Sequence, residues 1–223
     1  MKLSVIIPAY NEEATIEKII SKVKAVALVT EIIVVDDGST DRTPEIIDRI
    51  DGIKVVHKKN GGKGSAIRKG IEVATGDVTV IQDADLEYDP NDFVPMLEAM
   101  SREAADVVYG SRVLHENYKI SYRRYFWGGK IVTALANILY GISITDEPTC
   151  YKMIRTSLLR SLNLTCNRFE FCPEVTAKIA RRKIMIVEIP ISYYPRSMQE
   201  GKKISALDGL EAIWTLLKLR IDG

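Results

Sequence analysis

Short apolar segments alternate with stretches of helical periodicity through the first half of the chain. Continuous apolar runs at 3–7 and 31–35 are typical of interior strands of a parallel sheet. Between them, isoleucine and valine recur at helical spacing over 16–26, which predicts a crossover helix. The pattern then predicts a helix at 41–50, a strand at 53–57, a helix at 64–74 and a strand at 78–82. This alternation predicts an α/β fold with a doubly wound, mostly parallel sheet flanked by helices.

The second half has a looser pattern. It predicts a helix at 92–100, a strand at 106–109, a helix at 171–182, an extended segment at 184–189 and an amphipathic helix at 205–220. Residues 131–144 are mostly apolar, but this stretch is shorter than a bilayer and is interrupted by Thr133, Asn137 and Gly141. We expect a helix there that is buried or lies flat on a membrane.

Length and composition are those of an ordinary globular domain. With 223 residues the chain can bury a sizeable core, and 31 Lys plus Arg against 30 Asp plus Glu give no excess of positive charge that would favour nucleic acid as a partner. Cys150, Cys166 and Cys172 form no CxxC pair, which favours a reducing compartment and argues against a structural zinc site. The start of the chain does not resemble a signal peptide, and we expect no membrane-spanning helix.

The strand predicted at 78–82 ends at two carboxylates one residue apart. Asp83 and Asp85 point the same way along an extended chain, and like charges this close are stable only with a cation, a shared proton or water between them. A hard divalent ion such as Mg²⁺ or Mn²⁺, shared with the phosphates of a ligand, is the natural partner. A solvated acidic turn is the alternative interpretation.

The loops after the first four predicted strands also carry polar or glycine-rich residues. They are the segments 8–13, 36–41, 58–64 and 83–89. In a doubly wound sheet such loops meet at the carboxyl ends of the strands, where ligands bind. Their convergence favours a binding site over a solvated turn.

Seven motifs follow one another along the chain. They are VIIPAYNEE at 5–13, VVDDGSTD at 34–41, GGKGSAIRKGIEVATGD at 61–77, QDADLEYDP at 82–90, YGSR at 109–112, DEPTCYKMI at 146–154 and PRSMQEGKKI at 195–204. In their order and spacing they resemble the inverting family 2 glycosyltransferases with the GT-A fold, particularly the polyprenyl-phosphate branch that includes dolichyl-phosphate mannose synthases. The resemblance implies one GT-A domain over 1–223, with a nucleotide-sugar-binding half at 1–112 and an acceptor-side half at 113–223.

The resemblance also implies which residues bind the donor. Those expected to line the nucleotide-sugar are Pro8, Ala9, Tyr10, Glu12, Asp36, Asp37, Lys63, Gln82, Asp83, Ala84 and Asp85. Asp83 and Asp85 take the place of the metal-binding DxD pair of the family, and Glu87, where this branch often carries Gln, is implied as a further ligand for Mg²⁺ or Mn²⁺. Lys63 follows two glycines, so we expect flexible backbone amides and one positive charge to approach the diphosphate or base.

A phosphate acceptor is already nucleophilic at neutral pH, so it needs cations more than a general base. The resemblance implies as its ligands Arg112, Arg123, Arg124, Arg196, Lys202 and Lys203, with Arg112 joining Asp83 and Asp85 as catalytic residues. The main hypothesis is a metal-dependent inverting enzyme that moves a hexose, mannose or glucose, from a GDP- or UDP-sugar to a polyprenyl or dolichyl phosphate.

Aromatic and basic residues at 122–130, ahead of the apolar stretch, suit a membrane surface, whereas core packing is favoured for the final helix. We expect a peripheral protein at the cytoplasmic face of the membrane, working alone or with a membrane-spanning protein partner. Two alternatives remain open. One is a glycan or protein hydroxyl acceptor, with Glu170 or Glu174 as general base. The other is a non-catalytic nucleotide-sugar binder or membrane scaffold on the same fold.

Overall fold

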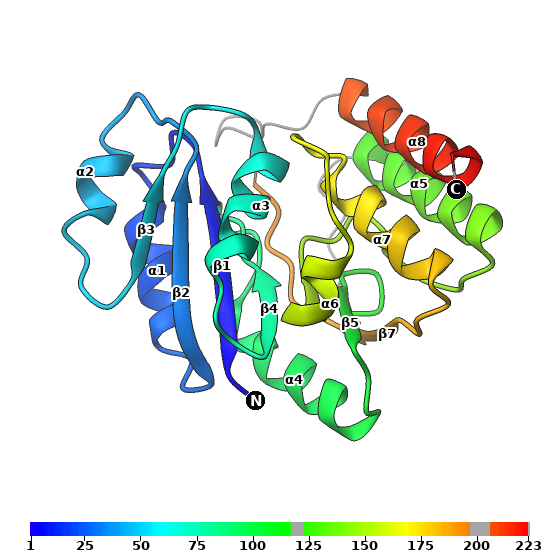
Figure 1. Ribbon diagram of the computed structural model, residues 1–223, viewed down its shortest axis with the longest axis horizontal. Coiled ribbons are helices and arrows are strands. Elements are labelled where there is room, and N and C mark those ends of the chain that lie inside the picture. Colours follow the sequence, from blue (N-terminus) through cyan, green and yellow to red (C-terminus); the bar gives the residue numbers. More distant parts are fainter. Residues whose placement is uncertain (117–122, 197–205, 223) are drawn as a thin grey trace.

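The fold is a seven-stranded sheet between layers of helices (Figure 1). The computed structural model describes residues 1–116, 123–196 and 206–222. The strands are β1 (Leu3–Ala9), β2 (Val29–Asp36), β3 (Lys54–His57), β4 (Val78–Ile81), β5 (Val107–Ser111), β6 (Lys152–Arg155) and β7 (Val187–Pro190). Their order across the sheet is β3-β2-β1-β4-β6-β5-β7. Strand β6 runs antiparallel to β4 and β5, and the other neighbouring pairs are parallel.

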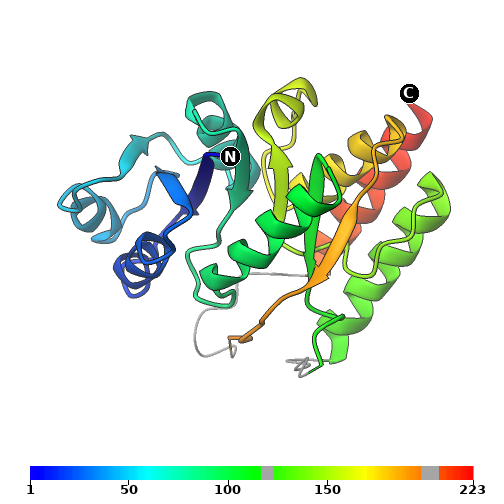
Figure 2. The same ribbon diagram turned by 90° about the horizontal axis from the view of Figure 1, so that it is seen from below.

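Helices cover both faces of this sheet. They are α1 (Ile16–Lys24), α2 (Thr43–Ile47), α3 (Lys63–Val73), α4 (Phe93–Arg102), α5 (Arg123–Tyr140), α6 (Thr156–Ser161), α7 (Phe171–Arg181) and α8 (Ala206–Ile221), with a short 3-10 helix, η1 (Pro90–Asp92). Helices α1 and α4 lie on one face, and α3, α6 and α7 lie on the other (Figure 2). Helices α5 and α8 lie side by side next to α7, on the side of the molecule away from β3.

The apolar runs form interior strands because helices cover them on both sides. All four residues of β4 are buried, and Val5, Ile6 and Ile7 of β1 have no exposed surface. A strand buried on both faces needs apolar side chains at successive positions, so its sequence does not alternate. The predicted doubly wound α/β sheet is therefore confirmed.

Differences from the predicted elements concentrate in the second half. The sequence pattern predicts neither β6 nor α6, which together span only residues 152–161 and are too short to show a clear period. Helix α5 begins at Arg123, earlier than expected, and ends at Tyr140 because Gly141 adopts a left-handed conformation with φ +64°. The apolar stretch beyond Gly141 is therefore not helical.

The prediction that the final helix packs into the core is wrong for one of its faces. Leu207, Leu210 and Trp214 of α8 are 69%, 62% and 65% exposed. Leu216 is fully buried, in a small cluster with Val132, Ala136 and Ala177. Apolar residues occur around most of this helix, so hydrophobicity alone does not indicate which face packs. In the described part of the chain, no helix combines the length and hydropathy needed to cross a bilayer.

Candidate active site

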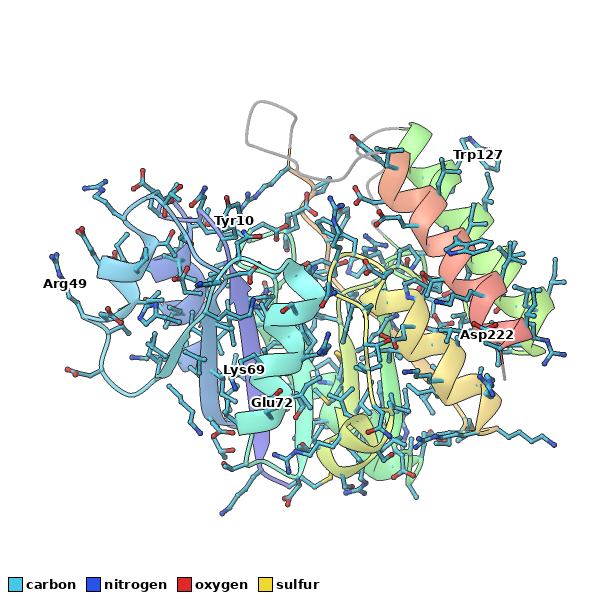
Figure 3. All side chains as sticks on the ribbon, turned by 45° about the horizontal axis from the view of Figure 1, so that its top comes forward. Tyr10, Arg49, Lys69, Glu72, Trp127 and Asp222 are labelled. Carbon is cyan, nitrogen blue, oxygen red and sulfur yellow. The ribbon has the colours of Figure 1, made fainter. Side chains whose placement is uncertain are left out.

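Loops from both halves of the chain meet at the carboxyl ends of the parallel strands. Ala9 closes β1 as a buried residue beside Asp36, and the carbonyl of Ala9 accepts the Asp37 amide at 2.8 Å. Pro8 is half-buried, and Tyr10 is 40% exposed at this edge (Figure 3). The backbone amide of Glu12 donates to the hydroxyl of Thr43, 2.9 Å away, at the start of α2. The residues expected to line the nucleotide-sugar therefore share one edge of the sheet.

Asp36 and Asp37 are buried, and their carboxylates organise the loop after β3. Asp36 accepts the Ser39 amide at 3.0 Å and contacts the imidazole of His57 at 3.1 Å. Asp37 binds the ammonium of Lys58 at 2.5 Å and accepts the amides of Gly61 and Gly62 at 3.0 and 2.7 Å. Their contact with a base or sugar stays a prediction, since both carboxylates already have partners within the protein.

The glycines at the start of α3 allow close packing against the segment 166–168. The amides of Gly64 and Ser65 donate to the carbonyls of Arg168 and Asn167 at 3.1 and 2.9 Å. Gly62 has φ +92°, and a Cβ there would lie 2.6 Å from the Asn167 carbonyl oxygen. The protein's own carbonyls and Asp37 accept these amides, so their approach to a diphosphate stays a prediction.

Lys63 instead brings its positive charge to the DxD pair. Its ammonium lies 2.6 Å from Asp83 Oδ1 and 5.6 Å from the ring centre of Phe169. Burial opposes the charge of Lys63, but Asp83 outweighs that effect and holds the pKa of Lys63 above its ordinary value. Lys63 therefore balances one of the carboxylates that the sequence assigns to a metal.

The second carboxylate of the pair is not balanced in this way. Asp85 accepts the Glu87 amide at 3.0 Å, and burial together with the charges of Asp83 and Glu87 raises the pKa of Asp85 to about 7. Crowded oxygen ligands of this kind fit a hard divalent cation. Asp83 and Asp85 thus have the chemistry expected of metal ligands.

Glu87 has other partners. Its carboxylate accepts the hydroxyl of Tyr193 at 3.0 Å and the backbone amide of Arg196 at 2.8 Å. Within the described ranges, no three His, Cys, Asp or Glu side chains are arranged as a ready metal site. Glu87 would have to exchange these partners before it could bind a metal, so its role as a ligand stays a prediction.

Gln82 and Ala84 support the turn that carries the two aspartates. Gln82 is fully buried: its side-chain oxygen accepts the Tyr151 hydroxyl at 2.6 Å, and its amide donates to the Asp83 carbonyl at 3.0 Å. Ala84 is 4% exposed. Gln82 therefore helps to position Asp83 through its hydrogen bond to the Asp83 carbonyl.

Arg112 is paired within the protein. Its Nε and Nη2 atoms donate to both oxygens of the Asp146 carboxylate at 2.8 and 2.7 Å, and its backbone amide donates to the same group at 3.0 Å. The guanidinium lies 5.9 and 5.1 Å from the ring centres of Tyr88 and Tyr193, which pack edge to face against each other. Burial opposes ionisation of Asp146, but Arg112 outweighs it and lowers the pKa of Asp146. The sequence motif DEPTCYKMI contains Asp146, but its pairing with Arg112 was not predicted.

The other predicted acceptor ligands are placed only in part. Arg196 donates through Nε to the Asp85 carbonyl at 2.5 Å, and its Nη2 lies 3.3 Å from Glu12 Oε2. It therefore joins the DxD turn to the first loop on the donor side. Arg123 and Arg124 belong to the first turn of α5, but their side chains, like the whole of Lys202 and Lys203, lie outside the described residues. Phosphate binding by this set stays a prediction.

Glu170 and Glu174, the candidate general bases, hold a loop of their own chain. Glu170 accepts the amides of Asn167 and Arg168. The bonds to Glu174 come from the Thr165 amide and hydroxyl, the Cys166 amide and the Lys178 ammonium. Burial opposes the charge of Glu174, but the hydrogen bonds from Cys166 and Lys178 outweigh it and lower its pKa to about 2. A carboxylate with so low a pKa is a poor proton acceptor.

Comparison with known proteins matches the chain to one family. Residues 4–162 match Glycosyl transferase family 2. The chain is 32% identical over 212 residues to a dolichol-phosphate mannosyltransferase of Pyrococcus furiosus, covering 91% of this chain and 59% of that protein. It is 29% identical over 247 residues to an undecaprenyl-phosphate mannosyltransferase of Micrococcus luteus, with 99% of both chains covered. The chain thus spans less than two thirds of the length of the archaeal relative.

A solved structure shares the fold. Glucosyl-3-phosphoglycerate synthase from Mycobacterium tuberculosis, crystallised with Mn²⁺, UDP and phosphoglyceric acid, superposes with a TM-score of 0.71 at 25% sequence identity. The match covers 99% of this chain and 78% of that chain.

Proposed function

The chain belongs to glycosyl transferase family 2, and we propose that it transfers a hexose from a GDP- or UDP-sugar to a polyprenyl or dolichyl phosphate. Mannose or glucose is the proposed sugar, transferred with inversion in a reaction that uses Mg²⁺ or Mn²⁺. The GT-A fold predicted from the motifs is confirmed. Support for the acceptor comes from two relatives whose names specify dolichol phosphate and undecaprenyl phosphate. Support for the metal comes from the Mn²⁺ and UDP in the structural neighbour.

The chemistry needs positive charge at the donor diphosphate. Departure of a nucleoside diphosphate leaves negative charge on its phosphate, which a bound divalent ion neutralises. Asp83 and Asp85 would hold that ion, and the raised pKa of Asp85 reflects their need for a cation. Lys63 lies beside Asp83 and is placed to exchange that carboxylate for a phosphate oxygen.

The observation that carries the choice of acceptor is the state of the two candidate bases. A hydroxyl acceptor must lose its proton to a general base, whereas a phosphate with a second pKa of about 6 is already ionised. Both Glu170 and Glu174 are occupied by the loop 165–168, and the pKa of Glu174 is about 2. The protein therefore suits an acceptor that arrives as an anion.

We propose that the protein acts at the surface of a lipid bilayer. Trp127 and Trp214, the two tryptophans of the chain, are 57% and 65% exposed on the adjacent helices α5 and α8. Trp127 lies on the outer side of this helix pair (Figure 3). The sequence of α5 contains Arg123, Arg124 and Lys130 and no acidic residue. Exposed tryptophans with basic neighbours suit an anionic bilayer surface.

The proposed side of the membrane is the cytoplasmic one. All three cysteines are free thiols, which suits a reducing compartment.

Turnover with defined acceptors tests the proposal. The purified chain is incubated with Mn²⁺ and a panel of GDP- and UDP-sugars, with a polyprenyl phosphate, with 3-phosphoglycerate or with no acceptor. We expect glycolipid and nucleotide release that depend on the polyprenyl phosphate and are lost in Asp85→Asn. Release that requires 3-phosphoglycerate, or that ignores the lipid, would replace the proposed acceptor. Nucleotide-sugar binding without turnover would favour a binding protein instead.

Flotation with vesicles tests the membrane surface. We expect wild type to float with phosphatidylcholine vesicles that contain phosphatidylglycerol, and less with phosphatidylcholine alone. Trp214→Ser should weaken binding by about tenfold, because it removes one large interfacial side chain. Equal flotation with both lipids would contradict the proposed surface. Binding to native membranes but not to lipid vesicles would indicate a membrane-spanning protein partner.

A further inference from the structure

Two polar residues interrupt the apolar sequence of α5, and both lie on the side that faces the protein. Thr133 is 5% exposed, and Asn137 follows it one helical turn later. Ile131 and Ile138 are 56% and 79% exposed, so they lie on the outer side with Trp127. Helix α5 therefore presents apolar residues to the outside and two hydrogen-bonding side chains to the inside.

The two polar side chains hold both ends of one turn. The side-chain amide of Asn137 donates to the Ile144 carbonyl at 2.9 Å and accepts the Ile144 amide at 3.0 Å. The hydroxyl of Thr133 accepts the Glu147 amide at 3.0 Å and donates to the Gly129 carbonyl at 2.8 Å. The segment 144–147 is thus attached to α5 through its backbone at each end.

This turn carries Asp146, the partner of Arg112. The backbone amides of Thr145 and of Asp146 itself donate to the carboxylate of Glu188 in β7 at 2.7 and 3.3 Å. The guanidinium of Arg112 in turn lies near the rings of Tyr88 and Tyr193, and the Tyr193 hydroxyl donates to Glu87 of the DxD turn. A short chain of contacts therefore runs from the inward-facing side of α5 to the Asp146–Arg112 pair.

Termination of the helix explains only part of this arrangement. Asn137 lies in the last turn of α5, and its bonds to Ile144 are of the kind that close a helix end. The bond from Glu147 to Thr133 is not, because Thr133 lies two turns before the end of the helix. The second contact fixes the position of the turn relative to α5.

We propose that Thr133 and Asn137 are positioning residues that fix the Asp146–Arg112 pair to α5, so that contact of α5 with a lipid surface changes the acceptor side of the site. This inference rests on the proposed function, which places the lipid substrate at that surface. Because both ends of the turn are bonded to α5, a shift or ordering of the helix on the lipid carries the turn with it.

Hydrogen exchange of the purified chain tests the coupling without requiring turnover. Amide exchange in peptides that contain residues 144–149 is measured by mass spectrometry, with and without vesicles of phosphatidylcholine and phosphatidylglycerol. We expect the vesicles to slow this exchange in wild type. Thr133→Val should accelerate it by about tenfold without lipid and abolish the effect of lipid, and Thr133→Ser should restore both. Equal exchange in Thr133→Val and Thr133→Ser, or an unchanged turn in vesicle-bound wild type, would overturn the proposal.

A matched control lies on the neighbouring helix. Thr215 of α8 also donates its hydroxyl to a carbonyl four residues earlier, at 2.8 Å, and among the described contacts the hydroxyl makes only that bond. Thr215→Val should leave amide exchange of residues 144–149 unchanged. If Thr215→Val accelerated this exchange as much as Thr133→Val does, the Thr133 effect would reflect general destabilisation and would contradict the proposal. Should Thr133→Val fail to fold, Asn137→Asp removes the bond to the Ile144 carbonyl and must accelerate exchange of the same turn.

Kinetics separate this inference from the proposed function. With a polyprenyl phosphate acceptor, Thr133→Val should raise the acceptor KM by about tenfold while the affinity for the nucleoside diphosphate stays within about twofold. Equal damage to donor and acceptor would mark a structural role and contradict positioning. Wild type that shows coupled exchange but transfers no sugar to the lipid would refute the proposed function and leave the coupling of α5 to the turn intact.

Discussion

The DxD pair and the Asp146–Arg112 pair are two carboxylate centres of one site, and they balance their charge in opposite ways. Asp83 has the Lys63 ammonium 2.6 Å away, whereas at Asp85 burial and the charges of Asp83 and Glu87 outweigh the charge of Arg196 and raise the pKa to about 7. Asp146 forms a two-point contact with Arg112, and its pKa is lowered. The first centre carries excess negative charge, whereas the second is neutral as a pair.

The DxD pair thus has the charge to bind an added cation, whereas the Asp146 carboxylate already has its counter-ion within the protein. A centre with excess charge is destabilising until a ligand neutralises it, so its cost in stability is tied to function. A buried pair that is already neutral contributes mainly by fixing geometry, and removal of one partner leaves an uncompensated charge. Substitutions at the two centres should therefore have opposite effects on stability.

Asp85→Asn should cause the largest loss of activity and should also increase stability. Because Asp85 is proposed to bind the metal, its substitution should lower turnover by about 10³-fold or more. Between about pH 4 and pH 7 the unfolded carboxyl is ionised while the folded one keeps its proton, so wild type loses stability as pH rises through this window. Denaturation in metal-free buffer should show Asp85→Asn gaining on wild type from pH 4 to 7. A gain that does not change with pH would contradict the excess charge.

Arg112→Met should be the most destabilising single change at the second centre. It leaves the Asp146 carboxylate buried without its partner, at a cost of about 3–5 kcal/mol. Urea denaturation measures this cost against Arg155→Met, which breaks a comparable pair with Asp106 at the surface and should cost at most about 1 kcal/mol. The double variant Arg112→Met, Asp146→Leu should recover much of the loss. Similar costs for Arg112→Met and Arg155→Met would contradict a buried, self-balanced pair.

Glu174→Gln tests a third carboxylate, one neutralised mainly by hydrogen bonds. Its pKa of about 2, against 4.5 when unperturbed, corresponds to about 3 kcal/mol that is present above pH 4.5 and lost as pH falls towards 2. Denaturation at pH 7 and pH 3 should show this loss shrinking at the lower pH. Turnover of the folded variant should stay within about threefold of wild type. A collapse of turnover without a change in stability would restore Glu174 as general base.

The regular strands and helices of the first half are predictable because the positions that are buried must be apolar. Strands covered on both faces appear as apolar runs, and β1 and β2 leave the sheet after Ala9 and Asp36, where polar residues follow. The face of α8 that packs is not predictable, because this helix has apolar residues around most of its surface. Strand β6 is only four residues long, so it shows no period.

The candidate site divides in a similar way. The DxD turn is predictable because two acidic residues, separated only by Ala84, closely follow a buried strand. The partners of charged residues are not, because they are distant in sequence: Arg112 meets Asp146 34 positions later, and Asp37 meets the Gly62 amide 25 positions later. A single sequence shows which groups are charged, but only the fold determines which of them neutralise each other.

Substitution of His57 should have the smallest effect on stability. This residue lies beside Asp36, one of the residues predicted to line the nucleotide-sugar. Its imidazole contacts Asp36 at 3.1 Å and Asp48 at 3.0 Å, and these hydrogen bonds raise the pKa of His57 above its ordinary value of 6.5. The charged imidazole therefore stabilises the fold below about pH 6.5, and this contribution is lost as pH rises through the raised pKa.

His57→Asn should consequently cost stability at pH 6 and much less at pH 9. The expected cost is below about 1 kcal/mol, because the side chain is 45% exposed and solvent screens both contacts. Denaturation at the two pH values, repeated in the Asp48→Asn background, separates the exposed contact from the buried one with Asp36. A cost that is larger at pH 9 than at pH 6 would show that neutral His57 is the stabilising form. In that case a neutral hydrogen-bond donor would stabilise the Asp36 carboxylate, in contrast to the positive charge of Lys63 beside Asp83.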